Sequence, residues 1–522
     1  MPSALARLDP GLRNLRLAVI AMVATLLSYA CALALKHAEH LTLNLVVLAV
    51  VLALSLSRTD RASEPGERLV AILLLPLVAV AASDVGTLLA QHATIGDALY
   101  VAAVSGAIWL RRFGSHLAKA GTLITLPFVA MLITPAVPGV GHPDVLWAAA
   151  IGVIAYFWVA VIRVTAQQTG FVTRPTTPTT PTTPARPQTA SRAQRQPARR
   201  RLPASTRMAI QMAVALAAAF AAGRALFGVH WSWLVMTAFI VCSGNRGRGD
   251  VVYRSALRIG GAATTGTIAA TLIAGTFAPG DVASVIVIFI VLGLATWLRP
   301  FNYAFWAAGI TSVLALLYGY FGETGATLLP HRLEGIVIGA AIGIAASWLI
   351  LPVRTTDVLR RRTADALAAL TDVLTAITTA PAELEARARR FAHTVTQLDE
   401  IAKPLEAHRF LSAIRRPGPH VADALDAARD ANAAVSAIVT STAANPDALS
   451  DAAVTERATT ILKALGRTRR ALGGRPAEPP SADHPDPGPP VPDSSLEQAL
   501  TDLDRALATF ARNAIADLAR SA

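Results

Sequence analysis

The stretch TRPTTPTTPTTPARPQTASRAQRQPARRRLP, residues Thr173–Pro203, separates two long apolar blocks of the sequence. It contains seven prolines, seven arginines and no acidic residue. Proline removes a backbone donor and fixes φ, and the polar residues offer no surface to bury. We therefore expect an extended, disordered connector here, and the fold depends on the blocks on either side of it.

The composition of the chain is typical of a membrane protein. Of its 522 residues, 53% are hydrophobic and 16% are charged, and the mean hydropathy is +0.47. The net charge of +13 is compatible with nucleic-acid binding, but the basic residues lie in short loops and in the connector. Such loops are typical of the cytoplasmic face of a membrane, so we predict no nucleic-acid partner.

Twelve apolar runs approach the length needed to cross a bilayer, roughly 17–25 residues. The six before the connector are Leu15–Leu35, Leu41–Leu56, Leu69–Leu89, Ile95–Leu110, Ala120–Val137 and Val145–Ile162. The six after it are Met208–Leu226, Trp231–Ser243, Ile259–Phe277, Val282–Leu298, Phe301–Phe321 and Leu333–Leu351. The sequence therefore predicts an all-α, polytopic membrane protein with about 12 transmembrane helices.

The loop charges predict an orientation. With the N-terminus inside, the loops on the inner side hold eleven Lys and Arg residues, and those on the outer side hold three. Lys and Arg favour the cytoplasmic side. We therefore expect a multi-pass protein of the plasma membrane with both termini in the cytoplasm.

The two blocks share short sequence motifs as well as a pattern of hydropathy. Trp109-Leu110-Arg111-Arg112-Phe113 recurs 188 residues later as Trp297-Leu298-Arg299-Pro300-Phe301, and Arg16 and Arg207 lie 191 residues apart. Each block has an even number of spans and begins on the same side, so the copies are expected to be parallel. We predict two six-helix repeats, residues 1–165 and 206–353, joined by a linker of residues 166–205.

Residues 354–522 have a different pattern, typical of Ala-rich amphipathic helices. One 4-3 seam of a packed helix comprises Leu384, Ala388, Phe391, Val395, Leu398, Ile401 and Leu405. A second comprises Leu496, Leu500, Leu503, Leu507 and Phe510. We predict a cytoplasmic helical domain with a disordered Pro-rich insert at residues 475–492, and we favour an assembly role over a regulatory one.

Signatures of an enzyme, a cofactor or a metal site are not found. Gly322–Thr327 resembles a phosphate loop but lacks its lysine. His37 and His40 flank Glu39, but no further ligand converges with them in the sequence, so an interfacial loop is the better interpretation. We therefore predict a protein that is not an enzyme and has no cofactor.

The second span of each half is short, with 16 residues in Leu41–Leu56 and 13 in Trp231–Ser243. Paired short spans indicate the binding site of a transporter. The substrate-path candidates around these two spans are Asn44, His230, Trp231, Trp233 and Thr237. Aromatic rings can stack on a flat substrate, although for Trp231 alone we slightly favour an anchor at the membrane interface.

Charged residues near the spans give further candidates. Arg258 and Arg332 both precede a glycine by three positions and can bind carboxylates at a pore mouth, although Arg258 is equally an anchor on the inner side. A carboxyl group buried in a membrane can carry a coupling proton, and Asp84 and Glu334 are our candidates for this role. The glycines of the last span, spaced by four, predict a surface for close helix packing: Gly335, Gly339 and Gly343.

The second half resembles the fusaric acid resistance, or aromatic acid exporter, superfamily of membrane transporters. Two stretches carry the resemblance: Tyr253-Arg254-Ser255-Ala256-Leu257-Arg258-Ile259-Gly260-Gly261, and His331-Arg332-Leu333-Glu334-Gly335 through Gly339 and Gly343 to Pro352. That family often has Arg-x-x-Gly-Thr-x-x-Gly, whereas Ala262 and Thr265 occupy the last two defined places here. The resemblance implies export of aromatic carboxylates or similar anions, driven by the proton gradient.

We therefore expect a membrane transporter that exports small organic acids, with two further candidate partners, the lipid bilayer and other copies of the chain. No adaptor protein is indicated. A passive organic-anion channel remains open as an alternative, because distant plant relatives in the resembling family are channels. A membrane scaffold that acts through its soluble helices is a third interpretation.

Overall fold

A computed structural model describes residues 9–41, 43–59, 65–132, 145–172, 202–243, 247–261, 276–322, 328–352, 355–399, 401–415, 422–472 and 495–520. Every regular element in these ranges is a helix, which confirms the predicted all-α class for them. Most of the connector Thr173–Pro203, the insert at 475–492 and most of the span Ile259–Phe277 lie outside the described residues.

The chain divides into two compact units. The first, which we call the membrane unit, is Met1–Asn245 with Arg254–Pro352. The second, the helical unit, is Arg246–Tyr253 with Val353–Ala522. Each unit is described separately below.

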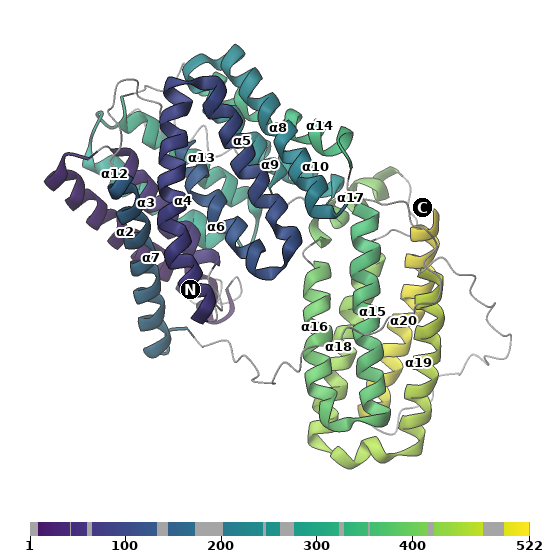
Figure 1. Ribbon diagram of the computed structural model, residues 1–522. Helices are drawn as coiled ribbons and strands as arrows, with labels where there is room; N and C mark the ends of the chain where they lie inside the picture. Colours follow the sequence, from purple (N-terminus) through teal and green to yellow (C-terminus); the bar gives the residue numbers. More distant parts are fainter. Residues whose placement is uncertain are drawn as a thin grey trace. The chain divides into compact units, whose positions relative to one another are not determined.

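The apolar blocks of the sequence form the helices of the membrane unit (Figure 1). Those of the first block are α2 (Arg13–Glu39), α3 (Leu43–Thr59), α4 (Pro65–Gln91), α5 (Ala93–Leu110), α6 (Ser115–Met131) and α7 (Val145–Gln168). Those of the second are α8 (Ala204–Phe227), α9 (Trp231–Cys242), α12 (Val282–Leu298), α13 (Tyr303–Tyr320) and α14 (Leu328–Leu349), with α10 (Arg248–Gly261) shared between the units.

Eleven of the twelve predicted spans coincide with one of these helices. Within the described residues, seven apolar stretches are long enough to cross a membrane, and one of them, Ala204–Cys242, contains both α8 and α9. Three further apolar helices are shorter: Leu43–Ser57, Ala120–Val129 and Val282–Leu298. The chain thus has the helices of a membrane protein, and the arrangement of twelve spans in two repeats stays a prediction.

Several hydroxyl groups inside the apolar helices bond to backbone carbonyl groups of their own helix. On α2 the hydroxyls of Thr25 and Ser28 donate to the carbonyl oxygens of Ala21 and Ala24, at 2.7 and 2.8 Å. Two later helices begin at residues whose side chains accept a backbone N–H: Asp281 caps α12 and Asn302 caps α13. Such bonds allow hydroxyl and amide groups to lie where water does not compete for them.

Helices pack closely where a glycine faces a small residue. A Cβ atom added to Gly121 on α6 would lie 2.2 Å from the carbonyl oxygen of Ala107 on α5. A Cβ atom added to Gly309 on α13 would lie 2.3 Å from Cβ of Ala295 on α12. Glycine is therefore required at both contacts, as is common where membrane helices approach closely.

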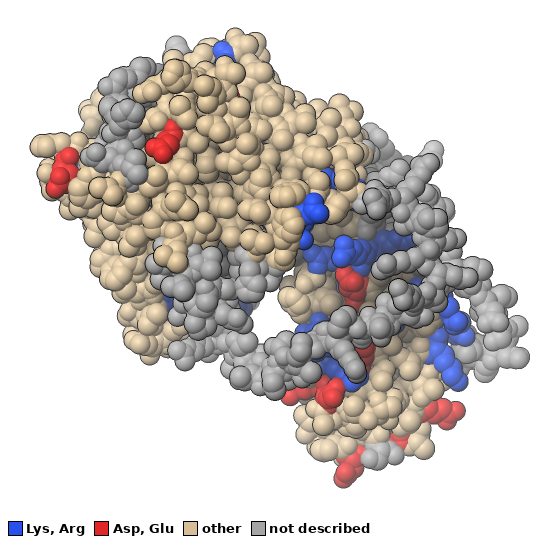
Figure 2. Space-filling model, in the orientation of Figure 1, with Lys and Arg blue, Asp and Glu red and all other residues tan. Residues whose placement is uncertain are grey.

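The helical unit is a bundle with its own apolar core. Its helices are α15 (Thr355–Thr379), α16 (Leu384–Asp399), α17 (Ala402–Arg415), α18 (Asp423–Ala444), α19 (Ala452–Leu472) and α20 (Ser495–Arg520). The two predicted seams are buried, apart from Leu405, which is only partly buried. In Figure 2 charged side chains are frequent among the described atoms of this unit, whereas those of the membrane unit on the same face are nearly all uncharged.

Candidate functional site

The candidate site lies around α9, the short helix that the sequence singled out. It has 12 residues, about 18 Å at 1.5 Å per residue, and follows a 3-10 turn at Gly228–His230. It packs against α8 and α14, which also contact each other. Ten of its residues are buried, among them Trp231, Trp233 and Thr237. Both tryptophans therefore lie inside the protein, and Trp231 is not an exposed anchor.

Trp233 is the centre of an aromatic wall, by which we mean His230, Trp233 and Tyr318. The ring of His230 lies 4.3 Å from that of Trp233, between centroids, and the ring of Tyr318 on α13 lies 5.3 Å from it, edge to face. Trp233 is 3% exposed, and its indole Nε1 has no hydrogen-bond partner. The wall therefore combines flat apolar surface with a buried, unused donor.

Two arginines are buried beside this wall. The guanidinium of Arg332 lies 5.8 Å from the Trp233 ring centroid and 6.0 Å from that of Tyr318, and the residue is 7% exposed. Arg258 is 3% exposed, its Nη2 donates a long hydrogen bond of 3.5 Å to the Thr237 hydroxyl, and its Nε has no partner. Both arginines contact α9, Arg258 at Thr237 and Arg332 at Trp233, so two like charges flank the same helix.

Neither arginine forms an ion pair with an acidic side chain among the described residues. Burying a charge costs several kcal/mol, and a cation–π contact returns only about 0.5–2 kcal/mol. A pair of buried cations is therefore short of negative charge. An anion bound between them and the aromatic wall would supply it.

The predicted glycines of α14 lie next to this cluster. A Cβ atom on Gly339 would lie 2.8 Å from the Leu234 carbonyl oxygen, and one on Gly343 would lie 2.6 Å from a methyl of Val241. Gly335 has more room, because its nearest neighbour is Trp233 Cβ at 3.7 Å. Two of the three glycines thus set the close approach of α14 to α9.

Comparison with known proteins assigns this part of the chain. Residues 212–346 match the family described as fusaric acid resistance protein-like. This segment is thus similar to that family. It contains the aromatic wall and both buried arginines, and it confirms the resemblance for the second half. No curated protein and no solved structure matches the chain significantly.

Three predicted site residues lie apart from the cluster in the fusaric acid resistance protein-like segment. Asn44 is half-buried on α3 in the first half of the chain. Asp84 on α4 and Glu334 on α14 have exposed side chains. Their role as proton carriers stays a prediction.

Sequence reasoning missed the ion pair of the membrane unit. Arg224 on α8 contacts Asp97 on α5 through two hydrogen bonds of 2.7 and 2.6 Å, and it also donates to the carbonyl oxygen of Leu89. Its guanidinium lies 4.7 Å from the ring centroid of Trp231. The residues are 127 positions apart, and the one available signal was that both lie at predicted outer span ends. Tyr318 was missed because no feature of the neighbouring sequence distinguishes it from the other aromatic residues of the apolar helices.

Proposed function

We propose that the chain is a membrane transporter of small organic anions, with aromatic carboxylates as the preferred substrates. The observation that carries this proposal is the pair of buried arginines, Arg258 and Arg332, without an acidic partner among the described residues, beside an aromatic wall. The family match over the same residues and the apolar helices support a transporter.

Different residues of the cluster would bind different parts of such an anion. Guanidinium groups bind a carboxylate through charge-assisted, often bidentate hydrogen bonds, which suits Arg332 or Arg258. The rings of Trp233 and His230 offer a face on which an aromatic substrate can stack, and the free indole N–H offers one further donor. A neutral molecule of the same shape would leave the cations unpaired and bind more weakly.

We further propose that the membrane unit consists of two parallel copies of one six-helix unit, in the plasma membrane with both chain ends in the cytoplasm. The burial pattern supports the copies. The buried residues of α2 are Ala18, Ala21, Ala24, Thr25, Ser28 and Ala32. The residues 191 positions later on α8 are also buried: Ala209, Met212, Ala215, Leu216, Ala219 and Gly223.

The contacts between the halves are reciprocal, which is a second support. The buried residues of α12, Ser284, Leu292 and Ala295, correspond to the buried Gly96, Val104 and Ala107 of α5 at the offset of 188. Helix α5 packs against α8, the first helix of the other half, and α12 packs against α2 in the same way. Two copies related by a rotation axis are expected to make such matching contacts.

Transport by reconstituted protein tests the proposal. Proteoliposomes should take up radiolabelled benzoate faster than benzamide, which has the same ring without the charge. Arg332→Gln and Arg258→Gln should each weaken apparent affinity for benzoate by about 10- to 100-fold, since a hydrogen bond to a charged group contributes about 1.5–3 kcal/mol.

The matched control is Arg112→Gln, which removes an exposed arginine of the same unit. It should transport benzoate like the wild type. Equal uptake of benzoate by the wild type and both site variants would count against the proposed site. The absence of carboxylate uptake across a panel of aromatic acids would count against transport.

A passive anion channel is the second candidate, because the buried Arg258 and Arg332 can bind a permeating anion without any coupling carboxylate. A pH gradient and a membrane potential, imposed separately, distinguish the two. Uptake that follows the proton gradient and is lost in Asp84→Asn indicates coupling. Uptake that follows the potential alone, unchanged in that variant, indicates a channel.

A further inference from the structure

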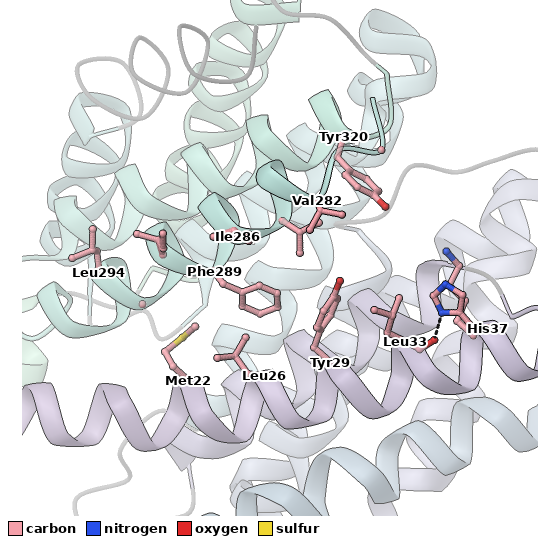
Figure 3. Close-up of a pocket in the computed structure, with 15 residues that line it drawn as sticks. Met22, Leu26, Tyr29, Leu33, His37, Val282, Ile286, Phe289, Leu294 and Tyr320 are labelled. Atoms are coloured by element: carbon pink, nitrogen blue, oxygen red, sulfur yellow. Dashed lines mark hydrogen bonds between the residues drawn. The ribbon is translucent and has the colours of Figure 1, made fainter. Parts of the chain in front are cut away.

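An apolar groove of about 880 Å³ runs between α2 and α12, away from the arginine cluster (Figure 3). One wall is a single face of α2 that includes Met22, Leu26 and Leu33. The other is formed by α12, where Ile286 and Phe289 point toward the opposite helix (Figure 3). The groove thus lies where the two halves of the chain meet.

The groove is long and has a polar end. From Met22 to Lys36 the helix rises about 21 Å at 1.5 Å per residue, against a hydrocarbon core of about 30 Å. Lys36 and His37 line that end, and the groove is also lined by Tyr29 and Tyr320. Lys36 has no ion pair with a described residue, and the nearby Asp281 is bound to the backbone N–H of Ala283 at the start of α12.

The matching contact on the other side of the unit is closed. There Asp97 and Arg224 join α5 to α8 by an ion pair at 2.6 Å. In the groove, Val285 corresponds to Asp97 (188 residues later) and Leu33 corresponds to Arg224 (191 residues earlier). Both Val285 and Leu33 line the groove. The groove therefore lacks the bond that ties the other contact together, and apolar side chains have taken its place.

Apolar walls that open to the surroundings indicate the kind of ligand. Ile286 and Ile290 are 56% and 55% exposed along the groove. In a membrane, such a surface faces acyl chains, and the cationic Lys36 at its end attracts an anionic head group. We propose that the groove binds one acyl chain of an anionic phospholipid, whose phosphate lies at Lys36 and His37.

The chemistry separates this site from the proposed transport site. A benzoate-sized anion would fill a small part of a 21 Å groove, whereas an acyl chain follows its length. The lipid would occupy the space between the two halves that side chains fill at the α5 and α8 contact. Binding here is independent of whether the arginine cluster transports aromatic acids.

Photolabelling of the full-length protein in neutral detergent tests the proposal. The probe is phosphatidylglycerol with a diazirine in one acyl chain, and a phosphatidylcholine probe with the same chain serves as comparison. Labelled peptides should come from α2 and α12. Phosphatidylglycerol should label more strongly, and Lys36→Ala should weaken its binding about fivefold, the value for one cation at an anionic head group.

A second variant fills the groove without disturbing the fold. A Cβ atom on Gly293 would meet only Met22 Cγ, at 3.7 Å, so Gly293→Leu should fit and occupy the groove. Its matched control is Gly106→Leu on α5, where a Cβ atom meets nothing within 4 Å. Labelling should be lost in the first variant and kept in the second.

Three results would overturn the proposal. They are equal labelling of Gly293→Leu and wild type, no preference for phosphatidylglycerol over phosphatidylcholine, and labels outside α2 and α12. Native mass spectrometry of the same samples tests the other possible occupant of the groove, a second copy of the chain. If Gly293→Leu abolishes a dimer while lipid labelling persists, the groove is a contact between copies and the lipid proposal fails.

Discussion

The three glycines of α14 give a stability prediction whose sign changes along one helix. Replacing glycine by alanine in a helix contributes up to about 1 kcal/mol of stability when the new methyl has room. Gly335 has that room, since its Cβ would lie 3.7 Å from the nearest atom. At Gly339 the new Cβ would lie 2.8 Å from both the Leu234 carbonyl oxygen and Thr237 Cβ. Neither the helix backbone nor a β-branched side chain can move away from the new methyl without a loss of stability.

Overpacking of this kind costs about 1–3 kcal/mol. The free energy of unfolding should therefore rise by up to about 1 kcal/mol in Gly335→Ala and fall by about 1–2 kcal/mol in Gly339→Ala. Gly343→Ala should resemble the second, because its Cβ would lie 2.6 Å from a methyl of Val241. Thermal unfolding in one detergent, with Gly106→Ala as the uncrowded control, measures the differences. If Gly339→Ala is as stable as Gly335→Ala, the close packing of α14 on α9 is wrong.

Three further predictions concern other parts of the chain. Asp97→Asn and Arg224→Gln should each lower the free energy of unfolding by about 2 kcal/mol. This value lies between those of surface and buried ion pairs, because the two side chains are 18% and 28% exposed. In a double-mutant cycle measured by thermal unfolding, the double variant should lose less stability than the sum of the two single variants. Leu500→Ala in the core of the helical unit, where Leu500 is fully buried, should cost about 2–5 kcal/mol and speed limited proteolysis of that unit. Burial opposes ionisation of Asp9, but backbone N–H groups at the start of α2 donate to it and lower its pKa below 3.8. Its stabilising contribution is therefore present above about pH 4 and lost as the pH falls through the lowered pKa, so Asp9→Asn should flatten the acid dependence of thermal unfolding.

The helices were predictable because their signal is local. In lipid every backbone N–H and C=O must bond within its own helix, so an apolar run of sufficient length has one structure available to it. The 4-3 seams of the helical unit are local in the same sense, and Leu384 and Phe391 are buried as their spacing predicted. The short α9 was visible as an interruption of hydropathy.

The site was predictable only in part, because its geometry depends on partners far along the chain. Arg332 could be chosen from the sequence as a carboxylate-binding candidate at a pore mouth, but Tyr318, whose ring centroid lies 6.0 Å from its guanidinium, belongs to another helix. Exposure of Asp84 depends on which face of α4 turns inward, and a uniformly apolar helix carries no periodic signal of that face. Asp97 could not be predicted as the partner of Arg224 for the same reason, because the sequence does not show which faces of the two apolar helices meet.

The proposed repeat can be tested by transferring the closed contact into the groove. Leu33 and Val285 occupy the places of Arg224 and Asp97 and line opposite walls. Leu33→Arg or Val285→Asp alone places an unpaired charge in apolar surroundings and should cost about 2.5–3.5 kcal/mol. In the double variant the two side chains face each other if the halves are copies, so a coupling energy of about 1–3 kcal/mol is expected in thermal unfolding. The new pair would also close the groove and abolish its lipid labelling. If the double variant is as unstable as the sum of the two single ones, these positions do not meet, and the correspondence between the halves does not extend to their contacts.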